Sequence, residues 1–127
     1  MFVDTNVFMY AVGAEHPLRN RAREFFRDSI KTRRPLVTSA EVLQELMHAY
    51  IPVGRMQTLD AALLLVRSAV TTVWPVEEED VRLARLLADS KPGFSARALL
   101  HIACCQRRDV RTIRTFDRQL AAAFTRR

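Results

Sequence analysis

Short apolar runs alternate along this chain with longer stretches in which hydrophobic positions recur every three or four residues. The short runs are typical of buried β-strands, and the longer periodicity is typical of helices that bury one face. Strands are predicted at 1–4, 36–38, 72–76 and 110–116. Helices are predicted at 17–30, 39–50, 54–70, 77–90, 95–109 and 117–124, and a short helix or a turn at 7–12. Strands that alternate with helices in this way call for a parallel sheet with helices on both faces.

Residues with known capping preferences mark where several of these helices begin. Pro17 stands where the missing N–H costs nothing, and Ser95 opens the next-to-last helix. Thr38 and Glu41 match a capping box, in which each side chain satisfies a backbone N–H at the start of a helix. That role accounts for Glu41, whereas Glu45, one turn further along, has no such role. Glu45 is therefore the better candidate for a functional carboxylate, with a surface position as the alternative.

The composition is that of a compact globular protein, expected to form a single domain over residues 1–127. Hydrophobic residues make up 49% of the chain and charged residues 27%. Because there is no apolar run of about 18 residues and no basic leader, we expect no membrane span, no signal peptide and a cytoplasmic location. Cys104 and Cys105 are adjacent within an apolar stretch, so they are interpreted as reduced core residues.

The net charge of +6 comes almost entirely from arginine, because Lys31 and Lys91 are the only lysines. Two of the arginines, Arg126 and Arg127, form a basic tail. A small, arginine-rich domain is a candidate for binding the phosphate backbone of a nucleic acid. A surface that reflects the arginine preference of a GC-rich genome explains the same charge equally well, so charge alone leaves the function open.

Two predicted strands end in an acid, Asp4 near the start of the chain and Asp117 near its end. In a parallel sheet both carboxylates project from the same edge, and the helix after the second strand can bring Glu45 to them. Three carboxylates within about 4 Å repel one another by several kcal/mol at an effective dielectric of about 20, so protons or a cation must neutralise them. Oxygen ligands favour Mg²⁺ or Mn²⁺, and such an ion can activate water against a phosphodiester. With the basic charge, these acids indicate a metal-dependent nuclease, although Asp4 could also simply cap the next helix.

Other polar residues point less directly to chemistry. Thr5, Asn6 and Thr115 are candidates for positioning a nucleophilic or metal-bound water, although capping and turn formation explain them nearly as well. The acidic run Glu77–Asp80 is interpreted as complementing a helix dipole. All histidines of the chain lack paired ligand spacing and are interpreted as surface or helix-packing residues. These are His16, His48 and His101.

At these residues the chain resembles the PIN-domain family, specifically the small VapC-type toxin ribonucleases of VapBC toxin–antitoxin systems. The matching motifs, in chain order, are Val3-Asp4-Thr5-Asn6, Thr38-Ser39 through Glu45, and Thr115-Phe116-Asp117. The resemblance covers nearly the whole chain and implies a three-layer α/β/α fold around a short parallel sheet of four or five strands. It also implies Mg²⁺ or Mn²⁺ at Asp4, Glu45, Asp117 and an acid at position 98, with cleavage of a structured RNA such as tRNA or rRNA. The implied partners are a second copy of the chain, in a homodimer, and a cognate VapB-like antitoxin that inserts a peptide into the acidic groove.

One position departs from the family pattern. The family has an acid in a stretch of the form Ser-x-Arg-Asp-x-x-His, and here Ala98 stands at the position of that acid. Either the natural protein has lost this ligand, or a deliberate acid-to-Ala change disarms a toxic enzyme; the intact flanking motif favours the second explanation. Asp89 and Asp109 lie in the wrong places to substitute. In either case we expect the chain to bind metal weakly and to cleave RNA poorly.

Two other functions compete with that of a toxin endoribonuclease. The chain could be a non-catalytic PIN-like module that binds RNA or sequesters an antitoxin, and an acid restored at position 98 would separate this reading from the enzyme. Alternatively, Asp4 could be a phosphoryl-transfer nucleophile. We rank this last, because such phosphatases use a second acid two residues on, and Asn6 stands there.

Overall fold

A four-stranded parallel sheet forms the centre of the molecule. The computed structural model describes residues 1–124, so the basic tail expected at Arg126 and Arg127 lies outside the described part. The strand order is β3-β2-β1-β4, and every pairing is parallel. The strands are β1 (Phe2–Val3), β2 (Val37–Ser39), β3 (Thr72–Trp74) and β4 (Ile113–Arg114). Because all strands run the same way, the residues that follow β1, β2 and β4 meet at one edge.

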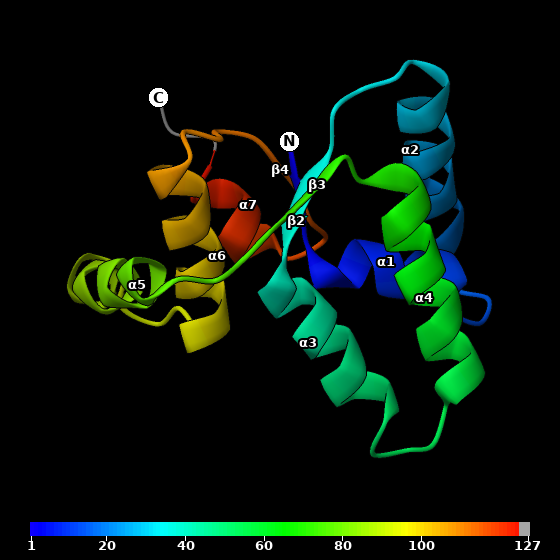
Figure 1. Cartoon of the computed structure of the whole chain (residues 1–127), viewed down its shortest axis with the longest axis horizontal. Helices are drawn as coiled ribbons and strands as arrows, with labels where there is room; N and C mark the ends of the chain where they lie inside the picture. The colour runs from blue at the N-terminus through cyan, green and yellow to red at the C-terminus, as the bar shows by residue number, and fades with distance from the viewer. Residues whose placement is uncertain (125–127) are drawn as a thin grey trace.

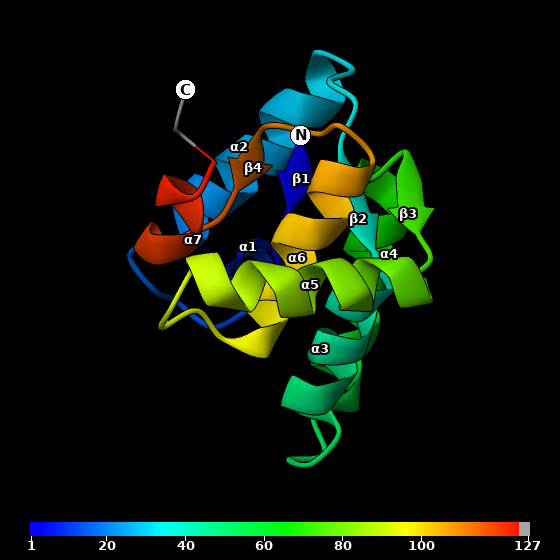
Figure 2. The same cartoon turned by 90° about the vertical axis from the view of Figure 1, so that its left-hand side faces the viewer.

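Helices cover both faces of the sheet and give a three-layer α/β/α arrangement. The helices α1 to α4 lie on one face, and α5 and α6 lie on the other, with the short α7 beside β4 (Figure 1). A view from the second side shows α5 and α6 crossing in front of the strands (Figure 2). The helices are α1 (Thr5–Val12), α2 (Arg19–Lys31), α3 (Ala40–Tyr50), α4 (Met56–Ala69), α5 (Glu78–Ser90), α6 (Ala96–Arg107) and α7 (Arg118–Ala122). None of the helices in residues 1–124 combines the length and the hydropathy needed to cross a membrane.

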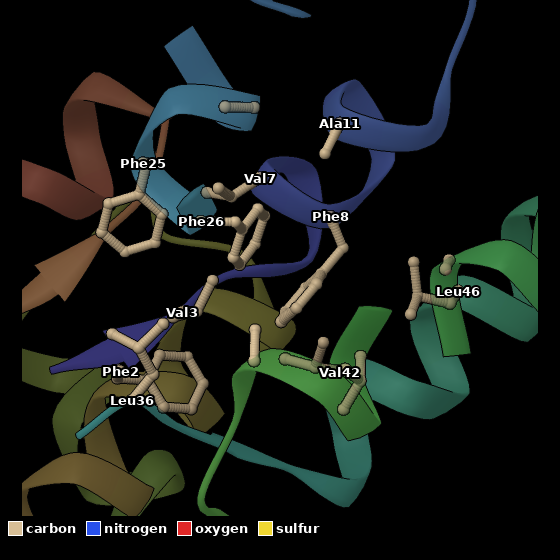
Figure 3. Close-up of a cluster of buried hydrophobic side chains, with 14 of the residues drawn as sticks. Phe2, Val3, Val7, Phe8, Ala11, Phe25, Phe26, Leu36, Val42 and Leu46 are labelled. Carbon is tan, nitrogen blue, oxygen red and sulfur yellow. The ribbon is translucent and has the colours of Figure 1, made fainter. Parts of the chain in front are cut away.

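The main hydrophobic core lies between the sheet and the layer of α1 to α4. Phe2 and Val3 of β1 belong to one buried cluster with Val7 and Phe8 of α1 and Leu46 of α3, and all five side chains are fully buried (Figure 3). Burying one such side chain stabilises the fold by about 1.5 to 3 kcal/mol. The strand and the helix on either side of Asp4 are thus both anchored in the main hydrophobic core.

The predicted alternation of strands and helices is confirmed, but the strand predicted at 110–116 is much shorter. Only Ile113 and Arg114 pair in the sheet. The reason is that β4 pairs with β1 alone, and β1 is itself only two residues long. The predicted core position of the two cysteines is confirmed, because Cys104 and Cys105 are buried and free.

The capping box predicted at Thr38 and Glu41 is wrong. Thr38 still belongs to β2, and its hydroxyl donates a hydrogen bond of 2.8 Å to the carbonyl oxygen of Val3 in β1. Ser39 is the N-cap of α3, and its side chain makes no capping hydrogen bond. The Thr38 hydroxyl, which was predicted to cap α3, thus joins β2 to β1 instead.

The acidic run that begins α5 does more than complement a helix dipole, so that interpretation is incomplete. Glu77 and Asp80 form a capping box, and the fully buried Asp80 also accepts hydrogen bonds of 2.8 Å from Arg107 and from Arg108. The Arg108 guanidinium lies over the ring of Trp74, 5.0 Å from its centroid. These contacts tie α5 and α6 to the end of β3. They were not foreseen because the two arginines follow Asp80 by 27 and 28 residues.

Candidate active site

Asp4 follows β1 directly and lies at the centre of a polar site at the carboxyl edge of the sheet. Its backbone N–H donates to the carbonyl oxygen of Arg114 at 3.0 Å, which continues the pairing of β1 with β4. Its Oδ1 accepts a hydrogen bond of 2.7 Å from the backbone N–H of Thr5. Asp4 is buried. Asp4 therefore follows a central strand and also caps α1, while its role in catalysis and metal binding stays a prediction.

Thr115, just beyond β4, connects the two ends of the chain at this site. Its hydroxyl donates a hydrogen bond of 2.7 Å to Oδ2 of Asp4 and accepts one of 3.3 Å from Nδ2 of Asn6. The same hydroxyl oxygen accepts from the backbone N–H of Asp117 at 3.0 Å, and Oδ1 of Asn6 accepts from the backbone N–H of Phe116 at 3.2 Å. A hydroxyl has one proton to donate, and here it goes to the carboxylate. Asn6 and Thr115 thus orient Asp4, while their role in placing a water stays a prediction.

Glu45 reaches the same site from the second turn of α3. Its carboxylate is buried, and its Oε1 accepts a short hydrogen bond from the hydroxyl of Thr5. Glu41, one turn earlier, is only partly buried, and burial followed by the charge of Glu45 raises the pKa of Glu41. Burial and contact with Thr5 thus distinguish Glu45 from Glu41, while the choice of Glu45 as a functional carboxylate stays a prediction.

His101 is not a surface residue, and the alternative interpretation as a packing residue accounts for only part of its position. The side chain is buried in the site, with Nε2 lying 3.1 Å from Oε2 of Glu45 and 3.6 Å from Oδ1 of Asp4. The ring of Phe2 packs against the imidazole with a centroid separation of 5.3 Å. The available signal was the spacing from Ala98, because residues three apart on a helix share a face. His16 and His48 are exposed, as predicted.

A cavity of about 250 Å³ opens over these side chains and gathers the positions that the family pattern assigns to its acids. Asp4, Glu45 and His101 line it, together with Asp117 and Ala98. The three acids predicted as site residues therefore converge in one place, and Ala98 lies among them.

Asp117 and Ala98 each stand near the beginning of a helix that borders the cavity. Oδ1 of Asp117 accepts hydrogen bonds from the backbone N–H groups of Gln119 at 2.9 Å and Leu120 at 3.2 Å, so Asp117 caps α7. The backbone N–H of Ala98 donates to Oγ of Ser95 at 3.1 Å, as expected for the third residue of a helix capped by serine. An acid at position 98 would therefore suit both the cavity and the helix dipole.

The charges in the cavity are partly balanced by the chain itself. Burial alone would raise the pKa of Glu45, but contact with His101 and with the hydroxyl of Thr5 lowers it below its usual range. Burial alone would likewise lower the pKa of His101, but contact with Glu45 and the charge of Asp4 raise it. Contact between the two side chains thus favours the charged forms of both Glu45 and His101.

The donor atoms that converge here form a possible metal site of mixed character. One ligand atom from each of Asp4, Glu45 and His101 lies within 4.8 Å of the others. Oε2 of Glu45 is buried and accepts no hydrogen bond from any described residue. Asp117 lines the cavity but is not one of the three. The sequence predicted that all ligands would be carboxylate oxygens. The structure instead brings together two carboxylates and one imidazole, because α6 places His101 beside the acids.

Comparison with known proteins agrees with this geometry. The PIN-domain family profile matches residues 1–124. The chain belongs to the PIN-domain family. Ribonuclease VapC23 of Mycobacterium tuberculosis is 62% identical over 124 residues, which cover 98% of each protein. Ribonuclease VapC13 of the same organism is 36% identical over 118 residues, covering 93% of this chain and 90% of the relative. The family relationship is therefore of the VapC type.

A solved structure supports the fold of this VapC-type PIN domain. The crystal structure of Mycobacterium tuberculosis VapC20, described as a sarcin–ricin loop cleaving toxin, aligns with a TM-score of 0.76 at 21% identity. The alignment covers 96% of this chain and 93% of VapC20. The predicted family and the predicted three-layer α/β/α fold are both confirmed.

Proposed function

We propose that this chain is the toxin of a type II toxin–antitoxin system and acts as an endoribonuclease that hydrolyses RNA phosphodiester bonds. Its membership of the PIN family, beside relatives named as VapC ribonucleases, supports an enzyme of this class. The observation that carries the proposal is the convergence of Asp4, Glu45 and Asp117 in one cavity at the carboxyl edge of the sheet. That edge is where parallel sheets place their sites.

The residues of the cavity fit a divalent cation, Mg²⁺ or Mn²⁺. Two carboxylates lie close together in a buried place, and Oε2 of Glu45 lacks a hydrogen-bond donor among the described residues. Asp4 and Glu45 would hold the ion, and Asp117 and position 98 lie on the same cavity. When bound, the ion would supply an activated water and neutralise charge that develops on the phosphate.

The chain's own residues prepare the site for that chemistry. Thr115 holds one carboxylate oxygen of Asp4, and Thr5 holds one of Glu45, so both acids are oriented before any ligand arrives. Arg97 lines the cavity and is exposed, and its guanidinium suits the phosphate of an RNA backbone. The net charge of +6 favours association with RNA over the whole surface.

Ala98 limits this activity. It lines the cavity beside the two buried acids, and its methyl group cannot bind a metal ion. We therefore propose that this sequence binds metal weakly and cleaves RNA slowly. Both explanations for Ala98, natural loss and a deliberate change, lead to the same expectation.

The proposed partners follow from the family. A VapB-like antitoxin would insert a peptide into the acidic cavity. The RNA substrate would be a structured tRNA or rRNA, so the proposed location of the protein is the cytoplasm. The relative VapC20 is described as cleaving the sarcin–ricin loop, which supports the rRNA class.

We also propose a homodimer, because an apolar groove of about 650 Å³ lies beside the edge strand β3 and includes the exposed Leu64.

The experiment that tests the enzyme compares Ala98→Asp with the unaltered chain in an RNA cleavage assay, with Mg²⁺ or Mn²⁺ and with chelator. Ala96→Asp is the matched control, because it adds an acid to the same first turn of α6 at an exposed position that does not line the cavity. We expect Ala98→Asp to cleave at least about tenfold faster than the other two, and chelator to stop it. Equal rates for all three proteins would contradict the proposed role of position 98.

A non-catalytic module that binds RNA or an antitoxin is the second candidate, and Ala98 is the observation that favours it. This function would apply if neither the unaltered chain nor Ala98→Asp cleaved any RNA while both still bound RNA or an antitoxin.

A further inference from the structure

We propose that His101 is a nitrogen ligand of the metal ion and that it makes this site prefer Mn²⁺, or another divalent transition ion, to Mg²⁺. The inference rests on the proposed function and adds to it, because the family resemblance implies only acids as the metal ligands. It starts from the place of His101 in the cavity rather than from its sequence spacing.

The distances between the donor atoms suit a shared ion. Two neighbouring ligands of an octahedral ion with bonds of about 2.1 Å lie about 3 Å apart. Nε2 of His101 lies 3.1 Å from Oε2 of Glu45 and 3.6 Å from Oδ1 of Asp4. Small movements would bring all three atoms to one ion, since each side chain already faces the others.

The close approach of His101 to Glu45 leaves room for a shared ligand. Nε2 lies 3.1 Å from Oε2, and Oε2 has no hydrogen bond of good geometry with the residues that the structure describes. An ion that binds both atoms would therefore displace no well-formed hydrogen bond from Oε2.

The surroundings of His101 make Nε2, rather than Nδ1, the nitrogen that faces the carboxylates. Nδ1 is buried and has no partner within residues 1–124, and the ring of Phe2 packs against the imidazole. His101 is 2% exposed, so its side chain cannot turn out to solvent without a change in packing. The ligand is thus oriented before a metal ion binds.

Position 98 explains why the nitrogen matters in this chain. Ala98 and His101 share one face of α6 and line the same cavity, so the helix offers an imidazole to the site but no carboxylate. Loss of a carboxylate removes a negative charge and a hard oxygen donor, which weakens attraction for Mg²⁺ most. Imidazole is a better ligand for transition ions, so Mn²⁺ retains more of its affinity.

The test measures metal binding without RNA or catalysis. The unaltered full chain is loaded with Mn²⁺, and pulsed electron paramagnetic resonance is used to detect coupling of the ion to a ligating nitrogen. We expect ¹⁴N coupling, which changes to ¹⁵N coupling when the histidines carry that isotope. His101→Gln should abolish the coupling, and His16→Gln and His48→Gln, at exposed positions, should retain it.

Affinities measured on the same proteins test the preference. We expect His101→Gln to lower the Mn²⁺ affinity at least about tenfold, while the Mg²⁺ affinity falls by a smaller factor. Ala98→Asp should raise the affinity for Mg²⁺ more than that for Mn²⁺. A His101 that acts only as a counter-ion predicts the reverse for His101→Gln, because removal of a competing positive charge raises the affinity for both ions.

Three results would overturn the inference: bound Mn²⁺ without nitrogen coupling, coupling that survives His101→Gln, or Mn²⁺ affinity that rises in that variant. In each case the metal site itself, and the proposed function, would stand. Failure to bind any Mn²⁺ at millimolar concentration would overturn both. If His101→Gln does not fold, the isotope substitution in the unaltered chain, with the two exposed-histidine controls, still identifies the ligand by elimination.

Discussion

Thr115 donates a hydrogen bond of 2.7 Å to Oδ2 of Asp4, across 111 positions of the sequence. This single contact joins the first strand of the chain to the segment that follows the last strand. The same hydroxyl accepts from Asn6 and from the backbone of Asp117, so the first and last motifs of the family pattern form one hydrogen-bonded unit.

We expect Thr115→Val to destabilise the fold by about 1 to 3 kcal/mol, because it removes the hydroxyl that pairs with a buried carboxylate and accepts two N–H groups. Urea unfolding measures this cost. Thr112→Val is the matched control, since Thr112 is an exposed threonine on the same segment. A loss of stability no larger than that of the control would show that the Thr115 hydroxyl contributes nothing to the fold.

Asp80→Asn should destabilise the fold at pH 7 by about 3 kcal/mol, because it breaks a buried ion pair with Arg107 and Arg108. Burial alone would raise the pKa of Asp80, but hydrogen bonds from Arg108, from the backbone of Glu77 and from Arg107 lower it far below its usual range. A lowered pKa in the folded state gives stability that is present above the unfolded-state pKa of about 3.9 and is lost as the pH falls below it.

The cost of Asp80→Asn should therefore shrink as the pH falls from about 5 toward the lowered pKa of Asp80. Unfolding curves recorded across this range measure the trend. Glu79→Gln, at an exposed position in the same turn, should have little effect at any pH. A cost for Asp80→Asn that is constant down to the acid limit would contradict the ion-pair account.

Leu64→Glu should convert the proposed homodimer to a monomer. Leu64 is 63% exposed beside the apolar groove on α4 and β3, and a carboxylate there would be buried without a partner in the dimer. Light scattering coupled to size-exclusion chromatography measures the mass. Leu86→Glu is the control, because Leu86 is 67% exposed on α5, in the opposite helical layer. Equal masses for both variants and the unaltered chain would place any dimer interface elsewhere.

The two cysteines should react with thiol reagents only after unfolding. Burial, the first cause in each case, raises the pKa of Cys104 to about 11 and raises that of Cys105 still further. The thiolate is the reactive form, so both side chains should be inert in the native state near pH 8. Titration with a chromogenic disulfide, with and without denaturant, measures this; rapid native labelling would contradict the buried positions.

Much of the fold could be predicted because the sequence carries local signals for it. Asp4 and Asp117 each follow a short apolar run. The alternation of such runs with stretches of helical periodicity is enough to predict a parallel sheet. Glu45 could also be chosen, although the capping argument that favoured it over Glu41 was wrong, since Thr38 serves the sheet instead.

The unforeseen features all depend on contacts between segments that are distant in the chain. His101 meets Glu45 and Asp4 only when α6 crosses the sheet, and its spacing from Ala98 was the one local indication of that approach. The same is true of Asp80, whose partners Arg107 and Arg108 lie at the far end of the next helix but are adjacent in space. Tertiary contacts, rather than local sequence preferences, determine where these side chains lie and which residues they contact.

The most direct test of a metal-dependent nuclease site in this cavity is an anomalous difference map from crystals of the unaltered chain soaked in Mn²⁺. We expect one strong peak about 2 Å from carboxylate oxygens of Asp4 and Glu45 and from Nε2 of His101. A fully soaked crystal with no peak in the cavity, or with its strongest peak elsewhere on the molecule, would contradict the assignment.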